Sequence, residues 1–216
     1  MMDIKEVIGD SGIIAVLEIE DVADAVPVAK ALVRGGIDAI ELALRTPAAE
    51  PSIERIAKEV PEMKIGIGTI IIPGQAEKVK KLGAAFGVAP GLNPDIMAEA
   101  KRVGLPFAPG ISSPSELEKA ISLGYRTVKL FPAEPLGGVA YLKSMNAPYN
   151  YLGLSYIPLG GVSLANLESW AKAKMVSSVG GSWIAKRDLI KAHAWDQIEK
   201  NASEAMELWK KLRAGV

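Results

Sequence analysis

The chain has 216 residues, of which 49% are hydrophobic, so it is long and apolar enough to fold around one sizeable core. Its 25 basic and 25 acidic residues balance, and this excludes a net charge that would attract nucleic acid or an anionic membrane surface. The chain also lacks a stretch of about 18 apolar residues, the minimum for a membrane span. We therefore expect small-molecule partners or further copies of the chain.

The chain contains no cysteine, which excludes disulfides, thiolate nucleophiles and sulfur ligands to a metal. Its first ten residues are acidic and mixed rather than basic and then apolar, which argues against a signal peptide. We expect a cytoplasmic location, with which both features are compatible. No linker or low-complexity stretch divides the sequence, so residues 1–216 are expected to form a single domain.

Short apolar runs alternate with amphipathic stretches along the whole chain. The expected strands are Ile13–Leu17, Ala39–Leu44, Lys64–Thr69, Phe86–Ala89, Pro106–Ala108, Thr127–Phe131, Leu154–Pro158 and Ser177–Val179. Helices are expected after each strand: Asp21 is a good N-cap, Ser113 and Glu116 have the spacing of a capping box, and Ile198 begins an apolar stripe near the C-terminus. The strands recur roughly every 20 to 28 residues, the length of one strand–helix unit.

Eight such units predict a single (β/α)8 barrel of the TIM type. An all-parallel sheet needs helical crossovers, and closure into a barrel removes its edges. The competing architecture is an open, doubly wound sheet, which would more often show a long interruption or a reversal point. The sequence shows neither feature.

The inventory of side chains at the strand ends restricts the chemistry. In barrels of this type the reacting groups lie at the carboxyl ends of strands and in the loops that follow. The only histidine, His193, lies beyond the last expected strand, which argues against a Ser-His-Asp system and a His-rich metal site. The segment Gly66-Ile67-Gly68 lacks the third glycine of a dinucleotide fingerprint. We therefore expect neither a metal nor a cofactor.

Lys129 is the most informative residue. Side chains alternate along a strand, so Thr127, Lys129 and Phe131 share one face, and Val128 and Leu130 share the other. The apolar face suits packing against helices, which points Lys129 into the barrel. An amine held there is poorly solvated as a cation, so a neutral, nucleophilic fraction is expected near neutral pH. The alternative is a lysine that reaches solvent or pairs with an acid.

Glu41 is expected to point into the same interior. Its strand places Ala39, Glu41 and Ala43 on one face, and the uniformly apolar Ile40 and Leu42 on the other. A buried carboxylate near an amine suits imine chemistry, in which protons move at every step. A purely structural Glu–Lys pair is the alternative.

Two glycine clusters follow the last two expected strands. They are Gly160-Gly161 and Gly180-Gly181-Ser182. The loops after these strands commonly bind phosphate in such barrels through backbone N–H groups. Glycine lets the backbone approach the anion, and Ser182 adds a hydroxyl donor. Ordinary tight turns are the alternative.

Several motifs of the chain resemble those of the 2-keto-3-deoxy-6-phosphogluconate (KDPG) aldolase family, which includes 4-hydroxy-2-oxoglutarate (KHG) aldolases. They are Ile40-Glu41-Leu42-Ala43-Leu44-Arg45-Thr46, Gly66-Ile67-Gly68-Thr69, Pro109-Gly110-Ile111-Ser112, Val128-Lys129-Leu130-Phe131-Pro132-Ala133-Glu134, Pro158-Leu159-Gly160-Gly161-Val162 and Gly180-Gly181-Ser182-Trp183. They cover nearly the whole chain in the family's order, and the lysine motif is the most specific.

The resemblance implies a homotrimeric class I aldolase that splits a keto-acid phosphate into pyruvate and glyceraldehyde 3-phosphate. The roles it implies are the imine lysine for Lys129, the general acid/base for Glu41, carboxylate anchors for Arg45 and Thr69, and a phosphate site at Gly160, Gly161, Gly181 and Ser182. We also expect Phe131 and Leu159 to line the substrate site.

The chain departs from the family pattern at three places. Leu159 stands where the family usually has Thr, whose hydroxyl helps to hold the pyruvate carboxylate. Glu18 stands where many members have Arg, and Ala89-Pro90 replaces a common Ser-Pro. The lysine and the glutamate of the imine chemistry are intact. An altered substrate or a reduced turnover would follow from the changes at Leu159 and Glu18.

Three other functions stay open at the level of sequence. One is a phosphosugar isomerase or epimerase in which Glu41 moves protons and Lys129 only stabilises charge. The second is a divalent-metal aldolase using Glu18 and Glu41, although the chain has few clustered carboxylates. The third is a trimeric scaffold or binding protein that has lost turnover.

Overall fold

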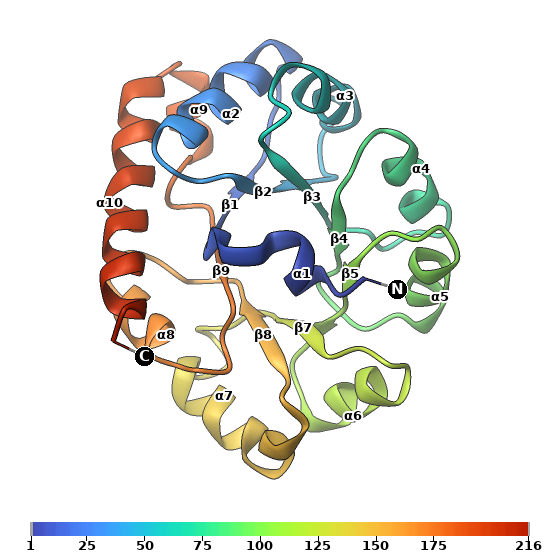
Figure 1. Ribbon diagram of the computed structural model, residues 1–216. Coiled ribbons are helices and arrows are strands. Elements are labelled where there is room, and N and C mark those ends of the chain that lie inside the picture. The colour runs from blue at the N-terminus through green and yellow to red at the C-terminus, as the bar shows by residue number, and fades with distance from the viewer. Residues whose placement is uncertain (1, 216) are drawn as a thin grey trace.

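The computed structural model describes residues 2–215 as an α/β fold in which parallel strands surround a common interior and helices lie outside them (Figure 1). The strands are β1 (Ile13–Leu17), β2 (Ala39–Ala43), β3 (Lys64–Gly68), β4 (Phe86–Val88), β5 (Phe107–Ala108), β6 (Gly110–Ile111), β7 (Thr127–Leu130), β8 (Ser155–Pro158) and β9 (Val179–Gly181). The helices are α1 (Ile4–Ile8), α2 (Ala25–Arg34), α3 (Ala49–Glu59), α4 (Gln75–Lys81), α5 (Pro94–Arg102), α6 (Pro114–Ser122), α7 (Gly138–Asn146), α8 (Leu167–Ala171), α9 (Arg187–Lys191) and α10 (Trp195–Arg213). Short 3-10 segments occupy Gly9–Ser11, Val22–Asp24 and Ala147–Leu152.

The strands form two parallel sheets, in the orders β5-β4-β3-β2-β1-β9 and β6-β7-β8. This confirms the expected parallel α/β fold, with neighbouring strands following the chain order. The fifth expected strand, Pro106–Ala108, corresponds to β5. The sequence did not predict β6, which is separated from β5 by Pro109, a residue with no N–H to donate to a ladder. On the other side of the three-stranded sheet, a single bridge joins Tyr156 of β8 to Val176, which precedes β9.

The helix starts follow from the capping residues. The Asp21 side chain accepts a hydrogen bond from the Ala23 N–H at 2.9 Å, where the chain turns into the 3-10 segment before α2. The Ser113 hydroxyl accepts from the Glu116 N–H at 3.4 Å at the start of α6. The Glu116 carboxylate reaches back to the Ser112 N–H at 2.7 Å, one residue earlier than in a standard capping box.

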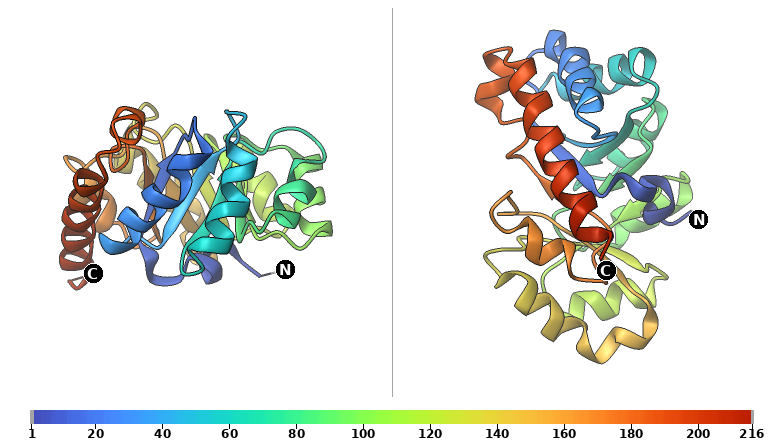
Figure 2. Two further views of the ribbon diagram at one scale, coloured as in Figure 1. Left: turned by 90° about the horizontal axis from the view of Figure 1, so that it is seen from above. Right: turned by 60° about the vertical axis from the view of Figure 1, so that its left-hand side comes forward.

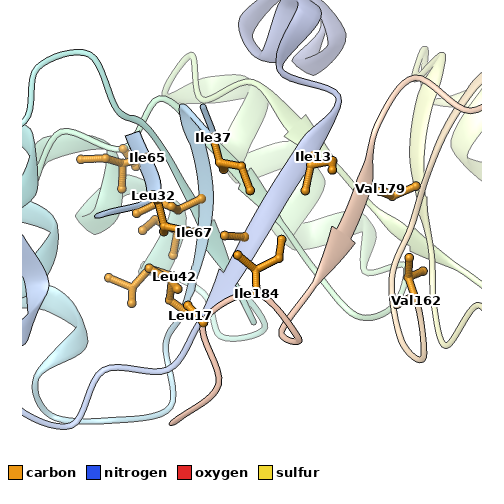
Figure 3. Close-up of a cluster of buried hydrophobic side chains, with 14 of the residues drawn as sticks. Ile13, Leu17, Leu32, Ile37, Leu42, Ile65, Ile67, Val162, Val179 and Ile184 are labelled. Atoms are coloured by element: carbon orange, nitrogen blue, oxygen red, sulfur yellow. The ribbon is translucent and has the colours of Figure 1, made fainter. Parts of the chain in front are cut away.

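The core has two parts, one on each face of the strands. The larger part lies between the strands and the surrounding helices, and Figure 3 shows side chains such as Leu17, Leu42 and Ile67 gathered with Leu32 of α2. The smaller part fills the interior and consists of Ile4, Ile8, Ile14, Ala39, Phe86, Val88, Ala108, Ile157 and Leu159. The α1 helix, which supplies Ile4 and Ile8, lies across one end of the strands (Figure 1). The long α10 helix runs along the outside and packs against α2 and α8 (Figure 2).

Candidate active site

A buried amine–carboxylate pair lies in the interior. The Lys129 Nζ of β7 donates to the Glu41 Oε1 of β2 at 2.8 Å and lies 3.2 Å from Oε2. Both side chains are only 5% exposed. The helix-facing neighbours Val128 and Leu130 belong to the outer part of the core, so the expected alternation along β7 is confirmed. The two sheets thus meet through an ion pair formed between residues 88 positions apart in sequence.

Two neighbours shape the surroundings of this pair. The Lys129 Nζ lies 5.4 Å from the centroid of the Phe131 ring, close enough for a favourable cation–π contact. Gly68 at the end of β3 leaves room for the carboxylate, because a Cβ at that position would lie 2.2 Å from the Glu41 Oε1. In the sequence, this glycine belongs to the Gly66-Ile67-Gly68-Thr69 motif and to an incomplete dinucleotide fingerprint. Its role in the structure is to make space for Glu41.

A cavity of about 490 Å³ opens above the pair. Its lining includes the expected site residues Glu41, Arg45, Lys129, Phe131, Leu159, Gly160, Gly161, Gly181 and Ser182. Thr69 does not line the cavity but lies beside it, where its hydroxyl accepts a 3.4 Å hydrogen bond from the Arg45 Nε. The structure thus brings together residues from β2, β7 and the loops after β8 and β9.

The glycine loop after β8 has a conformation that requires glycine. Gly160 and Gly161 have φ angles of 90° and 86°, values that side-chain-bearing residues rarely adopt. A Cβ on Gly161 would lie 2.6 Å from the Glu134 Cβ. Glu134 is itself held by the Trp170 Nε1, which donates to its carboxylate at 2.7 Å. Glu134 therefore supports the loop from behind and is absent from the cavity lining.

The segment after β9 contributes cavity residues that the sequence did not reveal. Lys186 and, at the start of α9, Arg187 and Asp188 line the cavity together with Ser182. Lys186 and Arg187 follow the predicted Gly181-Ser182 motif by only a few residues. This closeness to an expected phosphate loop is the one feature of the sequence that could have indicated their place in the site. Exposed side chains of a loop have no periodicity that would show where they point.

Charged side chains form a chain of contacts around the open end of the cavity. The Glu18 carboxylate lies 3.9 Å from the Arg45 Nη1 and 3.6 Å from the Arg187 Nη1. Glu20 pairs with Arg187 and, at 2.9 Å, with Lys191. Hydrogen bonds from Lys191 and Arg187 lower the pKa of the Glu20 carboxyl below its usual range.

Residues 2–215 show neither a metal site nor a membrane span. Within this range, no group of three His, Cys, Asp or Glu side chains is placed to hold a metal ion. No helix in the same range is long and apolar enough to cross a membrane. His193 lies outside the cavity lining, where its Nε2 is 3.0 Å from the Asp24 Oδ1 and its ring stacks on Trp195.

A buried lysine paired with a carboxylate, in a cavity at the ends of parallel strands, is the arrangement expected of a class I aldolase, a carbon–carbon lyase that works through an imine. The chain belongs to the KDPG and KHG aldolase family, whose model matches residues 4–201. This confirms the resemblance noted in the sequence.

Individual relatives and solved structures agree with this assignment. The chain is 40% identical over 202 residues to 2-dehydro-3-deoxy-phosphogluconate aldolase of Pseudoalteromonas atlantica, covering 94% of this chain and 93% of the relative. It is 40% identical over 195 residues to the KHG/KDPG aldolase of Escherichia coli, covering 90% and 91%. Among solved structures, the KDPG aldolase of Legionella pneumophila superimposes with a TM-score of 0.90 at 34% identity, covering 94% of this chain and 98% of that one. That crystal contains pyruvate captured at low pH as a covalent carbinolamine intermediate.

Proposed function

We propose that the chain cleaves 2-keto-3-deoxy-6-phosphogluconate to pyruvate and glyceraldehyde 3-phosphate through an imine on Lys129. The observation that carries the proposal is the 2.8 Å contact between the Lys129 Nζ and the Glu41 carboxylate inside the cavity. The E. coli relative is named for both KDPG and KHG, so 4-hydroxy-2-oxoglutarate is a second candidate substrate.

The reaction can be written with Lys129 and Glu41 alone. The Lys129 Nζ, in its neutral form, attacks the C2 carbonyl to give a carbinolamine, and Glu41 in its acid form donates the proton that lets the hydroxyl leave as water. The resulting protonated imine withdraws electrons from C3. The Glu41 carboxylate then takes the proton of the C4 hydroxyl while the C3–C4 bond breaks, and the aldehyde leaves. Protonation of the enamine at C3 and hydrolysis of the imine release pyruvate and restore the amine.

The other cavity residues are proposed to hold the two ends of the substrate. Arg45, supported by its contact with Thr69, binds the keto-acid carboxylate. Gly160, Gly161, Gly181 and Ser182 bind the phosphate through backbone N–H groups and the serine hydroxyl. Leu159 and Phe131 form an apolar wall beside the reacting carbon atoms.

We further propose that the two sheets act as one (β/α)8 barrel in a single domain spanning residues 1–216, with β5 and β6 as one strand interrupted at Pro109. Two contacts support this proposal where the sheets meet. A hydrogen bond from the Gly110 N–H to the Gly91 carbonyl joins β6 to the segment after β4, and the Tyr156–Val176 bridge joins β8 to the segment before β9. A homotrimer and a cytoplasmic location also stay predictions. Ile71 and Ile72, 49% and 58% exposed, offer apolar surface for contact between copies.

Reductive trapping tests the proposal directly. Incubation with pyruvate and borohydride should add one reduced adduct per chain, and peptide mass spectrometry should place it on Lys129. Lys64 is a matched control, because it is also a strand lysine paired with a carboxylate but lies outside the cavity. An isomerase or epimerase predicts no adduct, and either that result or an adduct on a different lysine would refute the proposal.

A Glu41→Gln variant tests the proton transfers separately. The amide keeps the shape of the side chain but cannot take up a proton, so we expect kcat to fall by about 10²- to 10⁴-fold, the usual contribution of a positioned acid or base. Circular dichroism and the unfolding midpoint verify that the variant is folded. An unchanged kcat in a folded variant would rule out this role for Glu41.

A further inference from the structure

Glu18 follows directly after β1, and its carboxylate contacts two arginines from different parts of the chain. Arg45 follows β2 and approaches Oε2, whereas Arg187 begins α9 and approaches Oε1. The Glu18 side chain is 23% exposed, so it is partly shielded from water, while both arginines are half exposed. All three residues line the cavity that contains Lys129. Glu18 therefore places a negative charge between two cations inside the site.

The charges of the cavity show what this carboxylate changes. Lys129 and Glu41 compensate each other, which leaves Arg45, Lys186 and Arg187 as the cations and Glu18 and Asp188 as the carboxylates. Within residues 2–215, Lys186 and Asp188 have no ion-pair partner within 4.0 Å. Glu18 is thus the cavity carboxylate that neutralises the arginines a substrate anion would use.

The Glu18 contacts have the length of loose ion pairs. Their separations of 3.9 and 3.6 Å exceed the roughly 2.7–2.9 Å of a charge-assisted hydrogen bond. A phosphate ester carries about 1.5 to 2 negative charges near neutral pH and can replace a carboxylate at an arginine. While it does so, it must stay close to the displaced Glu18, which repels it. A hydroxyl at the same place would instead donate a hydrogen bond to Glu18.

We propose that Glu18 is a specificity-determining residue. It occupies Arg45 and Arg187 in the absence of substrate, and it weakens the preference of this enzyme for keto acids that end in a phosphate over those that end in a hydroxyl. The inference rests on the proposed function, because it assumes that the distal end of the keto acid lies among Gly160, Gly161, Ser182 and Arg187.

The test compares two substrates that differ only in the phosphate. Wild-type enzyme and Glu18→Gln are assayed by pyruvate release with 2-keto-3-deoxy-6-phosphogluconate and with the same sugar acid without its phosphate. Glutamine keeps the shape of the side chain and removes the charge. We expect KM for the phosphorylated acid to fall about 3- to 10-fold, the scale of a partly exposed charge interaction. KM for the unphosphorylated acid should change less, because release of Arg45 favours the carboxylate of both acids, whereas loss of the Glu18 charge weakens the hydrogen bond from the terminal hydroxyl.

Glu20→Gln is the matched control. Glu20 also pairs with Arg187 but does not line the cavity, and an exposed ion pair of this kind contributes little, so its substitution leaves the charge inside the site unchanged. We expect Glu20→Gln to leave the ratio of the two KM values unchanged. The inference is overturned if Glu18→Gln leaves this ratio unchanged or shifts it toward the unphosphorylated acid. It is equally overturned if Glu20→Gln produces the same shift.

Failure of the proposed function is distinguishable from failure of this inference. If the wild-type enzyme cleaves neither keto acid and forms no pyruvate adduct with borohydride, the proposed function fails. The role of Glu18 is then decided by calorimetry with inorganic phosphate. The affinity should rise about 3- to 10-fold in Glu18→Gln alone. An unchanged or weaker affinity in that variant refutes the role.

Discussion

Replacement of Leu159 by Thr should strengthen the binding of the keto acid. Leu159 follows β8, is 4% exposed, and lies against Gly180, where a Cβ would come within 2.5 Å of the Leu159 Cγ. Its side chain also lines the cavity beside Lys129. A threonine hydroxyl at this place could donate to the keto-acid carboxylate, a hydrogen bond to a charged group that contributes about 1.5–3 kcal/mol. The expected gain in kcat/KM is therefore about 10- to 150-fold.

The same substitution should weaken the fold. Leu159 packs in the interior part of the core with Ile157, Phe86 and Ile14, and a shorter side chain leaves part of that space empty. We expect the free energy of unfolding to fall by about 1–3 kcal/mol. Urea unfolding measures this loss, and pyruvate release measures kcat/KM.

Leu159→Val is the control that isolates the hydroxyl. Valine has the shape of threonine without its oxygen, so it reproduces the lost packing but cannot donate a hydrogen bond. Only the threonine variant should gain in kcat/KM. Equal kcat/KM values for the two variants would show that the carboxylate does not lie next to residue 159, and the assignment of this end of the cavity would have to be abandoned.

Two further predictions concern the glycine loop and alkaline stability. Gly161→Ala should lower the free energy of unfolding by about 1–3 kcal/mol and raise KM for the phosphorylated acid, because its φ is 86° and its Cβ would collide with Glu134. Gly91→Ala, which meets no atom within 4 Å, should change neither quantity, and equal effects of the two variants would contradict the argument. The Tyr125 hydroxyl donates to the Met97 carbonyl at 3.0 Å, and burial raises the pKa of Tyr125 from 10.0 to about 12. The contribution of Tyr125 to stability is therefore complete below pH 10 and is lost as the pH rises toward 12. Tyr125→Phe should cost about 1 kcal/mol at pH 8 and reduce the loss of stability between pH 10 and 12, as measured by urea unfolding; an unchanged alkaline loss would argue against burial as the cause.

The sequence predicts the reacting pair well because burial on strands is periodic. Ile40 and Leu42 mark the helix-facing side of β2, which leaves only the interior for Glu41, and the same reasoning places Lys129. The break at Pro109 was harder to foresee, since a proline can end a ladder or lie within a continuous strand.

Other parts of the site depend on tertiary positions that have no local signal. Thr69 was expected in the site by resemblance, yet it contacts Arg45 from outside the cavity lining. The contacts of Glu18 with Arg45 and Arg187 join three segments far apart in the chain, whose mutual placement is set by the packing of the whole fold. Spacing along the chain does not encode such contacts.

The position of α1 has a consequence for how molecules travel through the enzyme. Ile4 and Ile8 of α1 are almost completely buried. They pack against Phe86 and Ile157 and close one end of the interior. Because α1 closes that end of the interior among residues 2–215, we expect the keto acid and water to enter, and both products to leave, through the open end of the cavity beside Glu18 and Arg187. On this expectation, a high concentration of the product bound nearer the opening should slow release of the other.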